Sequence, residues 1–520
     1  MSFLGLQEAS ILVVSFAALL YSLRRRTECP LPPGPPRLPL VGNALSIPTH
    51  YPQRYYKRLG DKLGSKILYF EAFGQPIVVL NSVQAGKDLL DKRSSTYSNR
   101  PHMTMFLEIM KIDYFFSFLP YGDIWRRDRR LLTQYFSPKT LDRDRDRITE
   151  FVRGALIAGI FQAPQDFRSH IRSCIGGFFI AVSYGIRIRR FNDPIIKLSE
   201  EAFDAVTSAV APGRFLVDVF PILKHVPDWM PGAGFKSLAK KWRQTVVRMS
   251  EDSYAATLQT LDNGTANASF LSDNMTLQSE DPSEEISLND LKRVAQQVYG
   301  AGFETTSVTL ITFMLAMLVH PDVQKRVQQE LDSAVPANRL PEFSDQPQLP
   351  YLTATLKEVF RWNTPVPLGV PRASTEDDVY EGYFIPKGST VLANAYAMLH
   401  DEELFPEPYT FKPERFMKDG QLMTDIPLDP AESVTFGFGR RICPGAHLVH
   451  PILFLAAAST LALFDIVPEL DSEGSPIEVV PQFSSDSLTS EPLPFKCRFV
   501  PRKERPIEHL LKDYLNADMI

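Results

Sequence analysis

Apolar residues recur with helical spacing along most of the chain, which predicts a mainly α-helical protein. A smaller set of positions forms short β-rich runs bounded by turn residues. These runs are residues 67–70, 77–80, 383–385 and 390–392. Gly74-Gln-Pro76 lies between the first two, and Pro386-Lys-Gly388 lies between the last two. The pattern therefore predicts one small β-sheet beside a helical body.

Residues 291–320 are apolar enough to form a core helix, with Ser287 or Asn289 as the predicted N-cap. Gly300 and Gly302 lie in the middle of this segment. Each glycine costs about 1 kcal/mol relative to alanine in a helix interior. An apolar helix that carries two of them is therefore predicted to open locally at this point.

A second apolar segment, residues 447–464, predicts another core helix. It contains Pro451, whose ring removes one backbone hydrogen bond and costs about 3 kcal/mol or more inside a helix. We therefore expect that this helix either kinks or begins irregularly.

The N-terminus has the pattern of a membrane anchor. Residues 3–23 are apolar except for Gln7 and Glu8, and three arginines follow at 24–26. A span of roughly 20 apolar residues crosses a bilayer, and the arginines would stay on the cytosolic side. The alternative is a cleaved signal peptide, but the charges follow the apolar run instead of preceding it. Residues 24–50, which include the stiff segment Pro30–Pro36, would form a basic and proline-rich hinge.

The remaining 470 or so residues show no sign of division. Among the 520 residues, positions 51–501 contain no long Gly/Ser linker, low-complexity block or internal repeat. This favours one large domain at residues 51–505, with a C-terminal tail at 506–520.

The net charge is −5 with both signs interspersed, which indicates no nucleic-acid partner. Four cysteines without paired spacing argue against a disulfide framework or a zinc site and indicate a reducing compartment.

Three N-glycosylation sequons lie in the polar stretch between residues 262 and 283. They begin at Asn263, Asn267 and Asn274. A domain that faces the cytosol is not glycosylated, so we expect these sequons to be unused and to lie in a loop between helices.

The most informative stretch is Phe436-Gly-Phe-Gly-Arg-Arg-Ile-Cys-Pro-Gly445. Its glycines let the backbone turn tightly and approach a flat ligand. Pro444 is placed to open a helix, so the Cys443 sulfur would lie beside a helix N-terminus that favours thiolate over thiol. The alternative for a lone cysteine beside a core helix is a buried structural residue.

The spacing of Phe436, Gly439, Arg441, Cys443 and Gly445 resembles the haem-binding loop of the cytochrome P-450 family of haem-thiolate monooxygenases. The resemblance implies the fold of that family, which is mainly α with a small β-sheet subdomain. It also implies haem b, iron protoporphyrin IX, with the Cys443 thiolate as the axial ligand of the iron. A cysteine thiolate in that position donates electron density that favours O–O cleavage.

Other positions match the family's haem contacts. Trp125 and Arg129 lie at i and i+4 on one predicted helix face, and both are pure hydrogen-bond donors. The resemblance implies that they bind the haem propionates, with Arg372 nearby and Arg100 as a weaker candidate for the same role. The alternative for such a basic run is a solvated helix face.

The segment Gly300-Ala-Gly-Phe-Glu-Thr-Thr306 resembles the family's oxygen-activation motif. By that match Thr305 would hydrogen-bond dioxygen and Glu304 would relay protons as a general acid. The alternative is that Thr305 bonds back to its own helix and that Glu304 sits in an ion pair.

A structural triad and a substrate pocket are also implied. Glu358, Arg361 and Arg415 match the family's buried Glu-Arg-Arg triad. The resemblance also predicts an apolar substrate pocket, for which the candidates are Phe115, Phe116, Ala301, Val366, Leu368 and Phe483. Residues 203–229 would be either an access lid or ordinary core.

Together these features resemble a membrane-anchored, microsomal-type P-450 of fungal secondary metabolism, with terpenoids as one possible substrate class. Such an enzyme sits in the endoplasmic reticulum membrane with a single span and faces the cytosol. Its partners would be an NADPH-dependent flavoprotein reductase, dioxygen, an apolar small molecule and membrane lipid. Two alternatives remain: the same fold catalysing a rearrangement or dehydration, and a haem protein that only binds ligands or transfers electrons.

Overall fold

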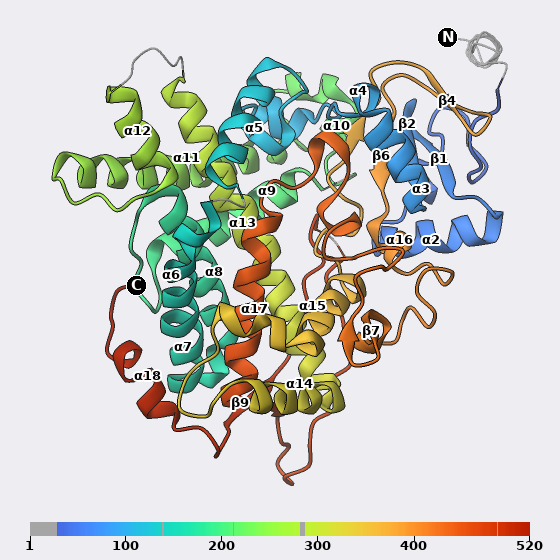
Figure 1. Ribbon diagram of the computed structural model, residues 1–520. Helices are drawn as coiled ribbons and strands as arrows, with labels where there is room; N and C mark the ends of the chain where they lie inside the picture. The colour runs from blue at the N-terminus through green and yellow to red at the C-terminus, as the bar shows by residue number, and fades with distance from the viewer. Residues whose placement is uncertain (1–28, 138–139, 212, 281–285, 486) are drawn as a thin grey trace, which may run out of the picture.

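The computed structural model describes residues 29–137, 140–211, 213–280, 286–485 and 487–520. Most of these residues are helical, as the sequence predicts. In Figure 1 the long helices fill the centre and left of the molecule, and the largest sheet lies at the right. The predicted anchor at residues 3–23 and the start of the predicted hinge lie outside the described residues.

The central helix is α13, which spans Leu288–Val319. Its N-cap is Ser287, whose side chain accepts the backbone N–H of Asp290, while the Asp290 side chain accepts the N–H of Ser287. The helix ends where His320 leaves the helical conformation ahead of Pro321. One of the two predicted N-caps is therefore confirmed.

The two glycines of α13 serve a different purpose from the predicted one. The helix continues through Gly300 and Gly302 without a break. A Cβ on Gly302 would overlap the ring of Phe179 on α8 (Phe167–Tyr184), and one on Gly300 would lie 3.0 Å from Phe203. The prediction of a local opening was wrong, because the glycines allow neighbouring helices to pack closely onto α13.

Most of the other helices of nine or more residues pack around α13, whereas α2 lies near the largest sheet and α18 lies at the lower left of the molecule (Figure 1). Their bounds are α2 (Pro52–Leu63), α5 (Asp123–Tyr135), α6 (Leu141–Phe151), α9 (Pro194–Ala209), α11 (Gly234–Asp262), α12 (Phe270–Glu280), α14 (Pro321–Ala334), α15 (Pro350–Trp362), α17 (Ala446–Leu463) and α18 (Ile507–Leu515). Shorter helices are α3 (Val83–Ala85), α4 (Ser94–Tyr97), α7 (Ala158–Gln162), α10 (Leu216–Val219) and α16 (Ala395–Leu399). The largest apolar core is built around α8, α13 and α17.

Helix α17 begins at Ala446, close to the start of the predicted segment and two residues after Pro444, with Gly445 as its N-cap. Pro444 therefore precedes the helix. Pro451 lies inside α17, which is continuous through it. The backbone acceptor left without its partner is the carbonyl of His447, in the first turn of the helix.

Among the described residues, α13 and α17 are long and apolar enough to cross a membrane by length and composition. The most apolar stretch of each is 83% and 78% buried inside the protein, respectively. These two helices are therefore core helices of the folded domain.

Four strands form the largest sheet, in the order β1-β2-β6-β3. Their bounds are β1 (Ile67–Ala72), β2 (Gln75–Leu80), β6 (Thr390–Ala393) and β3 (Arg372–Ala373). The predicted first hairpin is confirmed, although Phe73 and Gly74, both with positive φ, make its turn. Strand β2 then pairs in parallel with β6.

The remaining strands form separate pairs, so the prediction of one sheet was only partly right. Strand β5 (Tyr383–Ile385) pairs with β4 (Asp378–Tyr380), whereas β6 joins the larger sheet. The other two pairs are β7 (Met417–Lys418) with β8 (Gln421–Leu422), and β9 (Phe464–Pro468) with β10 (Cys497–Pro501). The turn at Pro386–Gly388 therefore connects two sheets instead of two strands of one sheet.

The three sequons do not share one loop. Asn263 follows the last residue of α11. The amide of Asn267 donates to the carbonyl of Gly185 at 3.0 Å, which ties this segment to the end of α8. Asn274 lies on α12, so the prediction that all three lie in a loop was wrong for this residue.

Candidate active site

A cavity lies between α13, α5, the start of α17 and the segment that leads into β3. Twelve residues that the sequence singled out line it: Arg100, Phe116, Trp125, Arg129, Ala301, Thr305, Val366, Arg372, Phe436, Arg441, Cys443 and Gly445. They come from segments more than 300 positions apart in the chain, so the fold brings the separate motifs to one place.

The loop before α17 presents the Cys443 sulfur to this cavity. The backbone N–H of Cys443 donates to the carbonyl of Phe436 at 2.8 Å and closes the loop. Gly437 and Gly439 both have positive φ, which glycine adopts without strain. A Cβ on Gly439 would also overlap the carbonyl of Leu90. The loop therefore needs glycine at this position both for its conformation and for its close packing.

Opposing effects act on the Cys443 thiol. Burial raises its pKa, and the backbone N–H groups of Gly445 and Ala446 and the charge of Arg129 oppose that rise. The predicted contribution of the helix N-terminus is present, but burial outweighs it. The protein environment therefore does not by itself favour the thiolate, whereas coordination to a metal ion deprotonates a thiol directly.

Cys443 also differs from the other buried thiols in the described part of the chain. Cys174 and Cys497 are buried and lie away from the cavity lining, and burial raises the pKa of each. Cys443 also lies deep in the protein, but its side chain borders the open cavity and is accessible from it. The alternative of a structural buried cysteine therefore describes Cys174 and Cys497 better than it describes Cys443.

Four arginines surround one side of the cavity. All four donate hydrogen bonds to backbone carbonyls. Arg100 donates to the carbonyls of Ser117, Val370 and Pro371, and Arg372 donates to those of Leu90 and Phe438. Arg129 donates to the carbonyl of Ile442, and Arg441 donates to those of Ser98 and Leu119. In the described part of the chain, none of the four forms an ion pair with a carboxylate. Their positive charge is therefore not neutralised by the protein.

The electrostatics reflect this excess of positive charge. Burial, together with the charges of Arg372 and Arg129, lowers the pKa of Arg441 to about 9. Burial likewise lowers the pKa of Arg372 to about 10 and holds that of Arg100 well below its usual range. A group of buried cations that destabilise one another is stabilised by an anionic ligand.

Two buried donors in this group have no hydrogen-bond acceptor among the described residues. The indole N–H of Trp125 is buried without an acceptor, and so is Nη1 of Arg441. The Arg441 guanidinium lies over the Trp125 ring, 4.3 Å from its centroid. Trp125 and Arg129 face the cavity, while Arg126 and Arg130 of the same helix face solvent. The basic run of α5 is therefore not simply a solvated helix face.

Thr305 and Glu304 adopt the alternative arrangement that the sequence left open. The Thr305 hydroxyl donates to the carbonyl of Ala301 at 2.8 Å, within its own helix. Glu304 pairs with Arg172 on α8 at 3.3 Å. Burial raises the pKa of Glu304. Thr305 lines the cavity, whereas Glu304 is held on the neighbouring face of α13.

The three members of the predicted triad lie together. Glu358 accepts hydrogen bonds from Arg361 at 2.7 Å and from Arg415 at 3.1 Å. The side chains of Glu358 and Arg361 are fully buried, and that of Arg415 is 9% exposed. Arg361 also donates to the carbonyls of Leu399, Pro408 and Thr410, so α15 is joined to the segment that follows α16.

A family model described as cytochrome P-450 matches residues 32–497 of the chain. The chain belongs to the cytochrome P-450 family. It is 40% identical to the cytochrome P-450 monooxygenase ple1 of Rhodocybe pseudopiperita, over 92% of this chain and 91% of that protein. It is 39% identical to the cytochrome P-450 monooxygenase COX1 of Coprinopsis cinerea, over 94% and 95% of the two chains. A third relative, cytochrome P-450 monooxygenase 98 of Postia placenta, is 36% identical over 95% of each chain.

The chain is thus a haem-thiolate monooxygenase, and its cofactor is haem b with an axial cysteine thiolate. The cavity of this P-450 fits that group. A haem carries two carboxylates, and the cavity offers unneutralised arginines together with unpartnered donors on Trp125 and Arg441. Apart from its chain neighbours, a Cβ on Gly445 would meet only the Cys443 sulfur within 4 Å, so the space next to Gly445 is open on the side of the sulfur.

Three predicted pocket residues lie outside the lining of this cavity, within the described residues. Phe115 packs against Phe106 and Phe118. Leu368 packs against the apolar cluster beneath β1 and β2, and Phe483 lines a separate cleft. In this structure each of the three side chains is directed to a neighbouring core or surface, so their contact with a substrate stays a prediction.

Other lining residues were missed but carried a signal in the sequence. Gln297 and Thr309 line the cavity with Ala301 and Thr305, at intervals of four residues on one face of α13. Leu132 and Phe136 extend the face of Trp125 and Arg129 in the same way. Helical spacing from the motif residues would have found both sets.

Proposed function

We propose that this P-450 inserts one atom of dioxygen into an apolar small molecule in secondary metabolism, and that terpenoids are the class to test first. The observation that carries the proposal is the apolar wall of the cavity above the thiol. The apolar lining includes Phe116, Phe136, Phe179, Val298 and Val366. Apolar side chains select an apolar substrate by excluding water from both surfaces.

In this proposal Cys443 is the axial ligand, held in place by its hydrogen bond to Phe436 and by the tight turn at Gly439. The unpartnered donors of Trp125 and Arg441 bind the haem carboxylates, together with Arg129, Arg372 and Arg100. When bound, the haem activates dioxygen, and electron donation from the thiolate favours O–O cleavage. The arginines hold the cofactor in one orientation because each guanidinium is itself fixed by backbone carbonyls.

Thr305 and Glu304 would control protons at the cavity. The Thr305 hydroxyl donates to Ala301 and keeps its lone pairs as acceptors within the cavity. Glu304 would hold a proton at its carboxyl oxygen and pass it inward after leaving Arg172. The raised pKa of Glu304 supports this role, because a general acid must be protonated near neutral pH.

The membrane arrangement is part of the same proposal. Residues 3–23 would form a single span in the endoplasmic reticulum membrane, and the domain would face the cytosol, where an NADPH-dependent flavoprotein reductase supplies electrons. The described part of the hinge supports a fixed attachment, because the carbonyls of Pro33 and Pro30 accept N–H groups of Tyr69 and Phe384. Extraction of membranes at high pH tests the anchor: the full chain should remain in the pellet, and release into the supernatant would contradict it.

Turnover of a terpenoid panel by the holoenzyme and reductase, under isotopically labelled dioxygen, tests the activity. We expect a product that carries one labelled oxygen atom and that requires both dioxygen and reductase. A product formed without dioxygen would contradict monooxygenation and favour rearrangement or dehydration. Haem binding without turnover of any apolar substrate class would favour ligand binding or electron transfer.

A further inference from the structure

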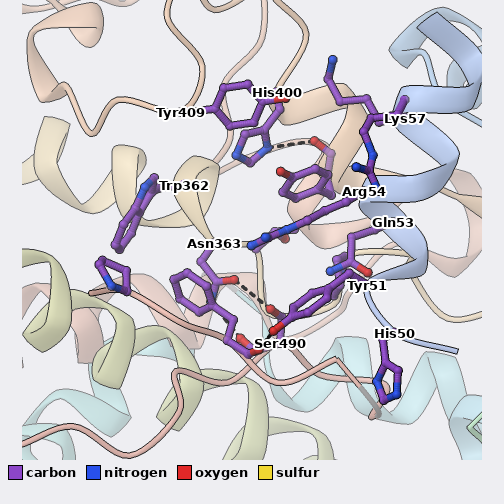
Figure 2. A pocket seen from close by; sticks show the side chains of 16 residues that line it. His50, Tyr51, Gln53, Arg54, Lys57, Trp362, Asn363, His400, Tyr409 and Ser490 are labelled. Atoms are coloured by element: carbon purple, nitrogen blue, oxygen red, sulfur yellow. Dashed lines mark hydrogen bonds between the residues drawn. The ribbon is translucent and has the colours of Figure 1, made fainter. Parts of the chain in front are cut away.

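A second cleft, of about 580 Å³, lies outside the haem cavity. It is formed by α2, the end of α15, the region of α16 and the C-terminal residues Pro481, Phe483 and Ser490 (Figure 2). The two lining sets share no residue. The chain between Asn363 and Pro367 separates them, with Asn363 and Thr364 facing the cleft and Pro365 and Val366 facing the cavity.

One wall of this cleft is cationic. Arg54, Lys57 and Arg58 follow one another at helical spacing on α2, and all three line the cleft. Lys57 pairs with the exposed Asp61 at 2.9 Å. In the described part of the chain, Arg54 and Arg58 form no ion pair, and no carboxylate lines the cleft. The wall therefore carries positive charge that the protein does not neutralise.

The opposite wall is aromatic. Trp362 and Phe483 pack edge to face, with ring centroids 5.5 Å apart, and Tyr409 lies against His400, with ring centroids 5.6 Å apart. Figure 2 shows Trp362 and Tyr409 on the side of the cleft that faces Arg54 and Lys57 of α2. A ligand that meets both walls at once needs a flat or apolar part next to an anionic part.

The cleft is already built, because its polar groups are fixed. Asn363 and Ser490 exchange two hydrogen bonds at 2.8 and 2.9 Å, which join α15 to the C-terminal segment. The hydroxyl of Tyr51 donates to the carbonyl of Phe483 at 3.0 Å and joins α2 to the same segment. The guanidinium of Arg54 lies over the Tyr51 ring, 4.7 Å from its centroid. A ligand would therefore need little rearrangement of the protein to bind.

The ionisation of His400 agrees with a positive cleft. Burial, together with the charges of Arg361, Lys57 and Arg54, lowers the pKa of His400 to about 3. His400 stacks on Tyr396 with ring centroids 4.0 Å apart and is neutral at physiological pH, so it presents an aromatic surface.

We propose that this cleft is a second binding site, for an organic phosphate whose apolar or aromatic body packs on Trp362 and Tyr409 while its phosphate is bound by Arg54 and Arg58. Phosphate suits the site better than a single carboxylate, because its charge is close to −2 and its oxygens match the fork of a guanidinium. The phosphate could belong to a soluble ester or to the head group of a membrane phospholipid.

Calorimetric titration of the holoenzyme with 1-naphthyl phosphate tests the proposal, with 1-naphthol and inorganic phosphate as separate probes. We expect saturable binding of the ester that leaves the Soret band unchanged, and weaker binding of either part alone. Arg54→Gln should weaken binding by about tenfold or more, the loss expected for one charge-assisted hydrogen bond, and Arg54→Lys should restore part of it. Arg248→Gln, which alters an exposed arginine on α11, should leave binding unchanged.

Absence of binding, or equal binding by wild type and Arg54→Gln, would overturn the proposal. A shift of the Soret band on titration would also overturn it, because the ester would then be occupying the haem cavity. The source of the phosphate follows from competition with vesicles. Displacement of the ester by phosphatidic acid vesicles, and not by phosphatidylcholine vesicles, assigns the site to a lipid head group. Binding that neither vesicle displaces assigns it to a soluble phosphate ester.

Discussion

This P-450 buries two groups of arginines, and they differ in what neutralises them. Arg361 and Arg415 both meet the carboxylate of Glu358. Among the described residues, the arginines of the haem cavity, such as Arg441, donate hydrogen bonds only to backbone carbonyls, and Nη1 of Arg441 has no hydrogen-bond acceptor. The first group is complete within the protein, which is the property of a structural element. The second group is complete only with an added anion, which is the property of a binding site.

Of the substitutions that distinguish the two groups, one in the Glu358 triad should have the largest effect, a loss of folding stability. Glu358→Gln would leave Arg361 buried beside a neutral amide, which should reduce the free energy of unfolding by about 3–5 kcal/mol. Denaturant unfolding of the variant measures this loss. Glu407→Gln is the matched control, because it breaks an exposed pair with Lys412 that is worth about 0–1 kcal/mol. Equal losses for the two variants would show that the triad is no more structural than a surface pair.

Glu304 and Arg172 do not fit either group, because they form a carboxylate–arginine pair that lies next to the cavity. Their side chains are 11% and 18% exposed, so the pair is less buried than the triad. If Glu304 relays protons, Glu304→Gln should slow turnover per haem by about 100-fold. Single-turnover kinetics and unfolding measure both effects. A loss of stability with unchanged turnover would place the pair with the triad as a structural element.

Substitution of a cavity arginine should weaken haem binding without lowering the stability of the haem-free protein. Arg441→Gln removes a buried charge that the protein does not neutralise, so the protein without haem should be no less stable than wild type. The same variant should lose haem about 10 to 100 times faster, as expected for one or two charge-assisted hydrogen bonds. Transfer of haem to an acceptor protein measures the rate.

Arg440→Gln is the control for this experiment, because Arg440 is exposed and bonds only the Tyr121 hydroxyl. Unchanged haem loss in Arg441→Gln would contradict the assignment of the cluster to the haem carboxylates.

The smallest expected effect is at the indole. Trp125→Phe removes one N–H and keeps the ring that packs under Arg441 and against Phe116. Haem loss should accelerate about fivefold, which corresponds to about 1 kcal/mol for one hydrogen bond. The same transfer assay measures it, with Trp242→Phe on α11 as the control. An effect as large as that of Arg441→Gln would mean that packing, and not the N–H, is what Trp125 contributes.

The sequence predicted a feature correctly where all the residues that form it lie in one short segment. Ser287 caps α13 because its partner Asp290 is three residues away, and the loop around Cys443 is closed by its own Phe436. It was insufficient where a distant element decides. Gly302 is required by Phe179 of another helix. No local pattern could distinguish packing of that kind from a functional opening of the helix.

The same limit applies to the site. Periodicity placed Trp125 and Arg129 on one face correctly, since both depend on a single helix. Leu368 and Phe483 are apolar and near the right segments, yet they point into a core cluster and the second cleft. Which side of a non-helical segment faces the cavity depends on tertiary packing, which local sequence does not encode.

The central claim is that Cys443 holds the haem in the cavity lined by arginines. The difference spectrum of the reduced, carbon-monoxide-bound protein tests it most directly, for wild type, Cys443→Ala and the control Cys174→Ala. We predict a Soret band strongly shifted to longer wavelength relative to histidine-ligated haem in wild type and Cys174→Ala, and absent in Cys443→Ala. A histidine-like band in active wild-type protein, or a shifted band that persists in Cys443→Ala, would contradict the claim.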